Sequence, residues 1–263
     1  MAKTRLDTLL VERGLFESRS RAAAAVMAGE VRLGTNGARA EKPGQLVAAD
    51  ADVAVDDLPG YVSRGGVKLA NALEAFGLDP SGRCCLDVGA STGGFTDCLL
   101  QRGAEHVMAL DVAYGELHWT LRGDSRVTVI ERVNARSLEP GTLAYRPDLI
   151  TMDVSFISLA KVLPAVLECA ADRFDCLALV KPQFEVGRER VGKGGVVRAA
   201  ADRRSAMVAV GNCALALGHS VLGFASSGLP GPKGNQESFV WIAESGRAGA
   251  LEDLEAAASM VEP

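Results

Sequence analysis

The stretch CLALVKPQFE places Lys181 directly after five apolar residues, 176–180. A short apolar run predicts a buried strand, and burying an ammonium group costs several kcal/mol unless it has partners. Three more charged residues hold comparable positions. Asp153 ends the run DLITM, Glu237 precedes SFVWIA, and Lys68 lies near the start of a predicted helix. Lysines and carboxylates gathered in one site are groups that enzymes use for proton transfer.

These four side chains can meet if their elements belong to one sheet. Ligands of open α/β sheets bind beyond the carboxyl ends of the strands, where Asp153 and Lys181 are expected. Glu237 joins them if its strand runs antiparallel. Lys68 joins them because a helix that feeds the first strand must begin near the same edge. We therefore predict a four-residue cluster. The alternative is two salt bridges that only close the sheet edge.

The elements that would position this cluster alternate between strand and helix patterns after residue 65. This rhythm predicts a Rossmann-like, doubly wound α/β sheet, largely parallel, with helices on both faces. The tail after residue 244 is predicted to be partly mobile. The predicted strands are residues 84–88, 106–112, 127–133, 148–154, 176–180, 221–226 and 238–244, and the predicted helices are residues 66–76, about 95–103, 158–171 and 202–218.

The first 59 residues form a separate predicted domain, followed by a linker at 60–65 and the α/β domain at 66–263. Helical composition covers residues 5–13 and 18–28, with Ser18 as N-cap and Gly29 as the stop. Strand-like pieces follow at 30–34 and 45–55, and TNG is the turn between them. Basic residues outnumber acidic ones up to residue 42, although the whole chain carries a net charge of −5.

Composition excludes several classes of protein. The 263 residues are 48% hydrophobic and 23% charged, which is typical of a globular protein. No run of eighteen apolar residues predicts a membrane span, and the charged N-terminus is unlike a signal peptide, so we expect a cytoplasmic protein. Six cysteines without a CxxC pair predict free thiols. Three scattered histidines show no metal-ligand spacing, so no metal site is expected.

A glycine loop, LDVGASTGGFTD at residues 86–97, follows the first predicted strand. It departs from the dinucleotide pattern GxGxxG because Ser91 replaces the second glycine. Asp87 would repel a pyrophosphate but suits a cationic donor, which favours S-adenosylmethionine over a dinucleotide. Asp111 is placed to bind ribose hydroxyls, and Asn134 to meet the adenine edge. The predicted cofactor residues are Asp87, Gly89, Ala90, Ser91, Gly93, Gly94, Phe95, Asp111, Val112, Asn134 and Asp153.

Ordered motifs give the chain a family resemblance. RLDTLL, SRSRA and GEVRL, at the start, are similar to the alpha-L RNA-binding domain of a small-subunit ribosomal protein. SRGGVKL, DVGASTGGFTD, MDVSFISL, VKPQFEVG and GNQES follow in that order. Together they resemble the TlyA family, bacterial ribosomal-RNA 2′-O-methyltransferases related to FtsJ, of which some were described as haemolysins.

The resemblance implies a role for each member of the cluster. Lys68, Asp153, Lys181 and Glu237 match the family's catalytic tetrad. Lys181 is expected to be the general base, Asp153 to orient it beside the donor's amine, and Lys68 and Glu237 to position the ribose. A lysine is a poor base near pH 7 unless its surroundings favour the neutral form. The implied substrate is a cytidine of 16S or 23S ribosomal RNA, or both, within ribosomal subunits.

RNA binding is expected on basic residues of both domains. The run VGKGGVV at 191–197 either closes over the substrate or is an ordinary flexible loop. Three rival readings remain: a non-catalytic ribosome assembly factor, a membrane-active haemolysin and a nucleotide-dependent oxidoreductase. The predicted RNA contacts are Arg5, Arg19 and Arg21 in the first domain and Arg64, Arg136, Arg188, Arg190 and Lys193 on loops of the second.

Overall fold

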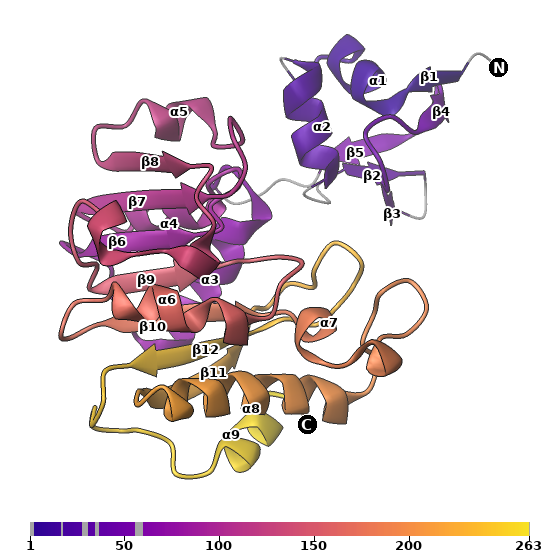
Figure 1. Ribbon diagram of the computed structural model, residues 1–263. Helices are drawn as coiled ribbons and strands as arrows, with labels where there is room; N and C mark the ends of the chain where they lie inside the picture. Colours follow the sequence, from indigo (N-terminus) through magenta and orange to yellow (C-terminus); the bar gives the residue numbers. More distant parts are fainter. Residues whose placement is uncertain (1–2, 17, 28–30, 35–36, 56–59, 263) are drawn as a thin grey trace. The chain divides into compact units, whose positions relative to one another are not determined.

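The chain divides into two compact units, Met1–Arg64 and Gly65–Pro263 (Figure 1). The computed structural model describes residues 3–16, 18–27, 31–34, 37–55 and 60–262. The predicted helix stop at Gly29, most of the TNG turn and residues 56–59 before the linker lie outside the described residues.

The first unit packs two helices against short strands. Ser18 caps the second helix, as predicted, because its Oγ accepts a hydrogen bond from the Arg21 amide. Leu6 and Leu10 face Val26 and Val31 in a small apolar core. The elements are β1 (Lys3–Arg5), α1 (Leu6–Glu12), α2 (Arg19–Met27), β2 (Val31–Leu33), β3 (Ala38–Arg39), β4 (Leu46–Ala48) and β5 (Val53–Val55), with β1 paired to β4 and the order β3-β2-β5 in the second sheet.

The second unit is built on a seven-stranded sheet with the order β11-β12-β10-β9-β6-β7-β8. In Figure 1, α6 and α8 lie in front of this sheet, and α3 and α4 lie behind it. The elements are α3 (Arg64–Phe76), β6 (Cys84–Val88), α4 (Gly94–Gln101), β7 (His106–Asp111), α5 (Trp119–Arg122), β8 (Val127–Glu131), β9 (Leu149–Met152), α6 (Leu163–Glu168), β10 (Asp175–Val180), α7 (Pro182–Glu185), α8 (Ala200–Ala216), β11 (Ser220–Ser226), β12 (Ser238–Ala243) and α9 (Leu254–Val261).

Strand direction decides which residues reach the functional edge. Strands β6 to β10 are mutually parallel, and β12 pairs antiparallel with β10, with Val180 opposite Ser238. All six residues of β10 are buried, as expected for a strand covered on both faces. The predicted Rossmann-like fold is confirmed. The reversed β12 brings the residue before it to the edge where β10 ends.

Two elements differ from their sequence predictions. The helix expected at 158–171 is interrupted, with a 3-10 turn, η3 (Leu159–Lys161), before α6. Pro164 stands in the first turn of α6, where its missing N–H is tolerated. The tail expected to be mobile forms α9, whose Leu254 and Ala258 are buried. Gly211 of α8 makes room for it, since a Cβ there would lie 2.8 Å from Leu254 Cδ1.

All six cysteines are free. Across the described residues, no helix is both long and apolar enough to cross a membrane. In the same part of the chain, no group of three or more His, Cys, Asp or Glu side chains is arranged to hold a metal ion.

Candidate active site

Two ion pairs bring the four predicted catalytic residues together beyond the strand ends. Lys181, directly after β10, places Nζ 2.6 Å from Oδ1 of Asp153, which directly follows β9. Lys68, on α3, places Nζ 2.5 Å from Oε2 of Glu237, which directly precedes β12. The antiparallel direction of β12 is therefore what brings Glu237 to this edge. The convergence expected from the sequence is present, and the catalytic roles remain predictions.

The Lys68–Glu237 pair is almost completely buried. The two side chains are 9% and 1% exposed. Asn71 lies one turn after Lys68 on the same face of α3, and its Nδ2 donates to the carbonyl of Ser227 at 2.9 Å. The loop before β12 is thus held by α3 at two points. Gly231 in this loop packs against the carboxylate, since a Cβ there would lie 2.4 Å from Glu237 Oε1.

The Lys181–Asp153 pair lies nearer to solvent. The side chains are 11% and 25% exposed, while Oδ1 of Asp153 itself is shielded from solvent. Lys181 Nζ also donates to Oγ of Ser155 at 2.6 Å. Burial raises the pKa of Asp153, but the ammonium groups of Lys181 and Lys68 lower it more, so the net shift is downward. Asp153 therefore stays ionised and interacts electrostatically with both lysines.

The glycine loop follows β6 and leads into α4. Gly89 has a φ of 83°, and a Cβ there would lie 2.8 Å from the carbonyl oxygen of Asp153, so only glycine allows this approach. The backbone amides of Gly89 and Ala90 both donate to the carbonyl of Leu110. Ser91 has a φ of 47° and is exposed at the tip of the loop. The loop is thereby fixed against β7 and β9.

Asp87 lies beneath this loop and is 0% exposed. Its Oδ2 accepts from the amide and the hydroxyl of Thr96, at 2.9 and 2.7 Å, and its Oδ1 accepts from Oγ1 of Thr151 at 3.3 Å. These contacts hold the first turn of α4. Burial raises the pKa of Asp87 to about 7, against the hydrogen bonds from Thr96. Direct contact of Asp87 with a bound donor remains a prediction.

We expect the ionisation of Asp87 to weaken the fold as the pH rises. An aspartate titrates near 3.9 in the unfolded chain, so between about pH 4 and 7 the folded state holds the proton more tightly. The stability linked to this proton is complete below about pH 4 and is lost as the pH rises towards 7. Urea unfolding of wild type and Asp87→Asn across this range measures it. A stability difference between the two that does not change with pH would contradict this expectation.

Other predicted cofactor residues lie at the ends of β7 and β8. Both oxygens of Asp111 accept backbone amides, Oδ2 from Ser91 and Oδ1 from Ala113, each at 2.8 Å. A carboxylate oxygen has a second lone pair, so both can still accept from a ribose. Val112 is 67% exposed and offers an apolar face. Asn134 is exposed and caps the 3-10 turn η1 (Ala135–Ser137) through Oδ1, which accepts from the Arg136 amide.

These residues suit a cationic nucleoside donor such as S-adenosylmethionine. Asp153 is an ionised carboxylate beside the glycine loop, and Asp111 is a second carboxylate at the end of β7, the strand that follows the loop and α4. Gly93, Gly94 and Phe95 open α4, whose N-terminal amides favour an anionic group such as a carboxylate. Such a donor carries both a cationic and an anionic group, and this edge offers complementary groups for each.

The predicted RNA-binding residues differ in exposure. Arg5 and Arg19 have side chains that are 50% and 58% exposed, and both pair with buried Asp7. Arg64 is only 5% exposed and is the first residue of α3, so the expectation that it lies on a loop is wrong. Arg136, Arg188 and Lys193 are exposed, and Arg190 is exposed and near Asp202. Arg21, in the first turn of α2, is half-buried.

Two residues beside the tetrad were missed at the level of sequence. Ser155 is the hydrogen-bond partner of Lys181. Phe156 is 92% exposed, has a φ of 65°, and its ring lies 5.4 Å from that of Phe184. A bulky residue in the left-handed region is a strained exception. Both belong to the motif MDVSFISL, but exposure and backbone strain cannot be inferred from the motif alone.

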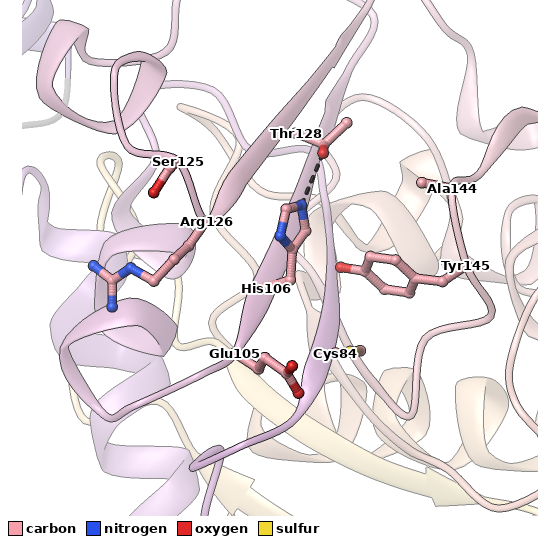
Figure 2. A pocket seen from close by; sticks show the side chains of 8 residues that line it. All are labelled: Cys84, Glu105, His106, Ser125, Arg126, Thr128, Ala144 and Tyr145. Atoms are coloured by element: carbon pink, nitrogen blue, oxygen red, sulfur yellow. Dashed lines mark hydrogen bonds between the residues drawn. The ribbon is translucent and has the colours of Figure 1, made fainter.

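A pocket of about 460 Å³ lies at the opposite edge, where β6, β7 and β8 begin (Figure 2). Two of its polar side chains bind each other, and a third binds a backbone carbonyl. His106 Nε2 lies 2.8 Å from Thr128 Oγ1, and the Tyr145 hydroxyl donates to the carbonyl of Cys85. Ligands of open α/β sheets bind at the carboxyl edge. The edge that carries Lys68, Asp153, Lys181 and Glu237 is therefore the candidate active site.

Comparisons with known proteins identify the family of this chain. A model of the FtsJ-like methyltransferase family matches residues 61–244, and a model of the S4 domain matches residues 4–53. The Mycobacterium tuberculosis protein named 16S/23S rRNA (cytidine-2′-O)-methyltransferase TlyA is 49% identical over 256 residues, which are 96% of this chain and 95% of that protein. The chain belongs to the TlyA family of FtsJ-like methyltransferases. The resemblance predicted from the ordered motifs is confirmed.

Two further proteins similar to this chain carry the name hemolysin. Hemolysin A of Brachyspira hyodysenteriae is 40% identical over 195 residues, covering 74% of this chain and 80% of that protein. A solved structure of a candidate hemolysin from Streptococcus thermophilus has a TM-score of 0.75 and 38% identity, covering 99% of this chain and 96% of that one. The shared fold thus extends over nearly the whole length of this TlyA-family chain.

Proposed function

We propose that this chain transfers a methyl group from S-adenosylmethionine to the 2′-hydroxyl of a cytidine in ribosomal RNA. The named Mycobacterium tuberculosis relative supports the reaction and the substrate class, and the S4 domain supports RNA binding. The observation that carries the proposal is the position of Lys181, paired with Asp153 and Ser155 at the end of a buried strand. Because the substrate is ribosomal, the reaction would take place in the cytoplasm on ribosomal subunits.

The residues divide the reaction between them. The donor supplies an activated methyl group. The ribose oxygen attacks the methyl carbon, the new O–C bond forms as the C–S bond breaks, and the hydroxyl proton passes to Nζ of Lys181. Lys181 must be neutral to accept it, and Asp153 and Ser155 hold Nζ in place. Lys68 and Glu237 position the ribose. Holding the two reactants in near-attack geometry supplies much of the acceleration.

Phe156 gives the substrate nucleotide a surface to stack on. Enzymes that modify one nucleotide of a structured RNA extrude it from its stack and hold the base against aromatic side chains. Phe156 is almost fully exposed three residues after Asp153 and is backed by the ring of Phe184. In this proposal the strained backbone of Phe156 is retained because it presents the ring to the base.

Phe156→Ala is expected to raise the RNA concentration needed for half-maximal transfer. Base–aromatic stacking contributes about 1–3 kcal/mol to RNA binding, so the RNA affinity should fall by a factor on the order of ten or more. Donor affinity should be unchanged. Phe156→Tyr, which keeps the ring, is the matched control and should act like wild type. Equal RNA affinity for wild type and Phe156→Ala would remove Phe156 from the substrate site.

The test of the proposed function is transfer of labelled methyl groups to ribosomal subunits that lack the modification. We expect label on RNA, at a cytidine whose 3′ linkage resists alkaline cleavage because its 2′-oxygen is blocked. Donor binding without transfer to either subunit would favour the non-catalytic assembly factor. Leakage of liposomes by the purified protein would support the haemolysin instead.

A further inference from the structure

Asn235 is a buried side chain that joins two loops at the tetrad edge. It is 2% exposed. Its Oδ1 accepts from the Val197 amide at 2.9 Å, and its Nδ2 donates to the carbonyl of Gly195 at 2.8 Å. Its own backbone carbonyl accepts from the amide of Gly231 at 2.8 Å. The side chain therefore binds loop 192–197 with both polar atoms, while its backbone belongs to loop 227–237.

Loop 192–197 is a closed turn. Gly192 and Val196 form an isolated antiparallel bridge, and the Gly195 amide donates to the carbonyl of Gly192 at 3.0 Å. Lys193 thus lies at the tip of the turn, and it is exposed. In Figure 1 the chain after α7 and the loop before β12 lie on the same side of the sheet. The glycine-rich run is thereby attached to its neighbour through Asn235.

A second lysine lies beside this turn. Lys233, on loop 227–237, is exposed. A Cβ built on Gly195 would lie 3.7 Å from both Cδ and Nζ of Lys233, so this side chain crosses the turn that carries Lys193. Within the described residues, neither lysine has a carboxylate partner, unlike Lys68 and Lys181. Two unneutralised ammonium groups at one edge suit a polyanion such as an RNA backbone.

The same loop carries Glu237. Its backbone carbonyl accepts from the Ser227 amide at 3.0 Å, and Gly231 packs against its carboxylate. Asn235 is two residues before Glu237 and is hydrogen-bonded to Gly231. Asn235 therefore couples the position of loop 192–197 to the position of the loop that places Glu237 beside Lys68.

We propose that Asn235 joins these loops into one cationic lip, defined as residues 192–197 and 227–237, whose Lys193 and Lys233 bind phosphates of the substrate RNA. In this arrangement Asn235 is a positioning residue. It couples the phosphate contacts of Lys193 and Lys233 to the position of Glu237. The inference rests on RNA being the substrate, as proposed above, and assigns a contact, Lys233, that sequence motifs did not identify.

The first arm of the test removes the charges. Lys193→Ala/Lys233→Ala should weaken binding to unmodified ribosomal subunits about tenfold and lower the salt dependence of binding by between one and two counterions, since each phosphate contact releases roughly 0.7–0.9. Arg173→Ala, which removes an exposed cation near the start of β10, is the matched control and should change neither quantity.

The second arm breaks the connection. Asn235→Ala should weaken RNA binding and also lower the saturated single-turnover rate about tenfold, while donor affinity stays close to wild type and the second unit remains folded at the assay temperature. Adding Lys193→Ala/Lys233→Ala to Asn235→Ala should reduce RNA affinity less than adding it to wild type. The reason is that without Asn235 the two loops no longer hold the lysines in place. A purely structural asparagine would give additive effects and no loss of saturated rate.

The outcomes separate this inference from the proposed function. If wild type methylates RNA but Lys193→Ala/Lys233→Ala binds RNA like wild type, the proposed phosphate contacts of the cationic lip are wrong and the proposed function stands. If wild type transfers no methyl group yet the lysine variant loses RNA affinity and salt dependence, the proposed function fails and the phosphate contacts stand. Full saturated rate in Asn235→Ala would overturn the positioning role.

Discussion

Lys181→Ala is expected to abolish methyl transfer while leaving the fold and donor affinity intact. A positioned general base contributes about 10²- to 10⁴-fold in rate, and no other described side chain forms the same contacts with Asp153 and Ser155. Single-turnover transfer to ribosomal subunits measures the loss. Calorimetry checks that donor affinity is unchanged, and the melting temperature checks that the fold is intact.

Lys181→Arg makes this test specific. Arginine keeps the positive charge and the ion pair with Asp153, but it does not lose its proton in proteins. If Lys181 is the base, Lys181→Arg should be as inactive as Lys181→Ala, although its fold should be closer to wild type. Activity retained in Lys181→Arg would show that the site needs only a cation there, and the general-base role would be wrong.

Glu237→Gln is expected to lower both the folding stability and the rate of methyl transfer. It leaves Lys68, whose side chain is 9% exposed, without its carboxylate partner, and breaking a buried pair from one side costs about 3–5 kcal/mol of folding stability. Methyl transfer should fall at least a hundredfold at temperatures where the variant is still folded. Urea unfolding and single-turnover transfer measure the two effects separately.

A double variant separates structure from catalysis. Lys68→Met/Glu237→Gln removes both charges, and neutral replacement of a buried pair is often tolerated. Stability should recover most of the loss seen in Glu237→Gln, whereas transfer should remain low. Recovery of transfer along with stability would mean that the pair only closes the sheet edge, which is the alternative that the sequence left open.

The convergence of Asp153 and Lys181 could be predicted because both directly follow strands of the predicted parallel sheet. Glu237 and Lys68 could be placed there only on the condition that β12 runs antiparallel and that α3 begins at the same edge. Apolar runs mark β9, β10 and β12, and a charged residue at the end of each run must lie at an edge. From the residue positions alone, which lysine pairs with which carboxylate could not be predicted, and only the family resemblance implied that Asp153 orients Lys181. The pairing depends on the antiparallel direction of β12 and on where α3 lies, and both are properties of the assembled sheet.

Other features depend on contacts that local sequence does not carry. Asp87 could be identified as part of the glycine-loop motif, but its burial beneath Thr96 and Thr151 comes from tertiary packing. The helix α9 is stable because Leu254 fits against Gly211, far away in sequence. Asn235 lies in a motif, GNQES, but its bonds to a second loop are visible only in three dimensions.

Gly231 has no functional group, yet its missing side chain leaves room for the Glu237 carboxylate that pairs with Lys68. A mutational scan for activity should therefore score this position as intolerant even to alanine, alongside the four charged residues. The same reasoning helps in judging uncharacterised sequences. A protein that keeps all four charged residues but has a larger side chain at this position should be suspected of having lost its activity.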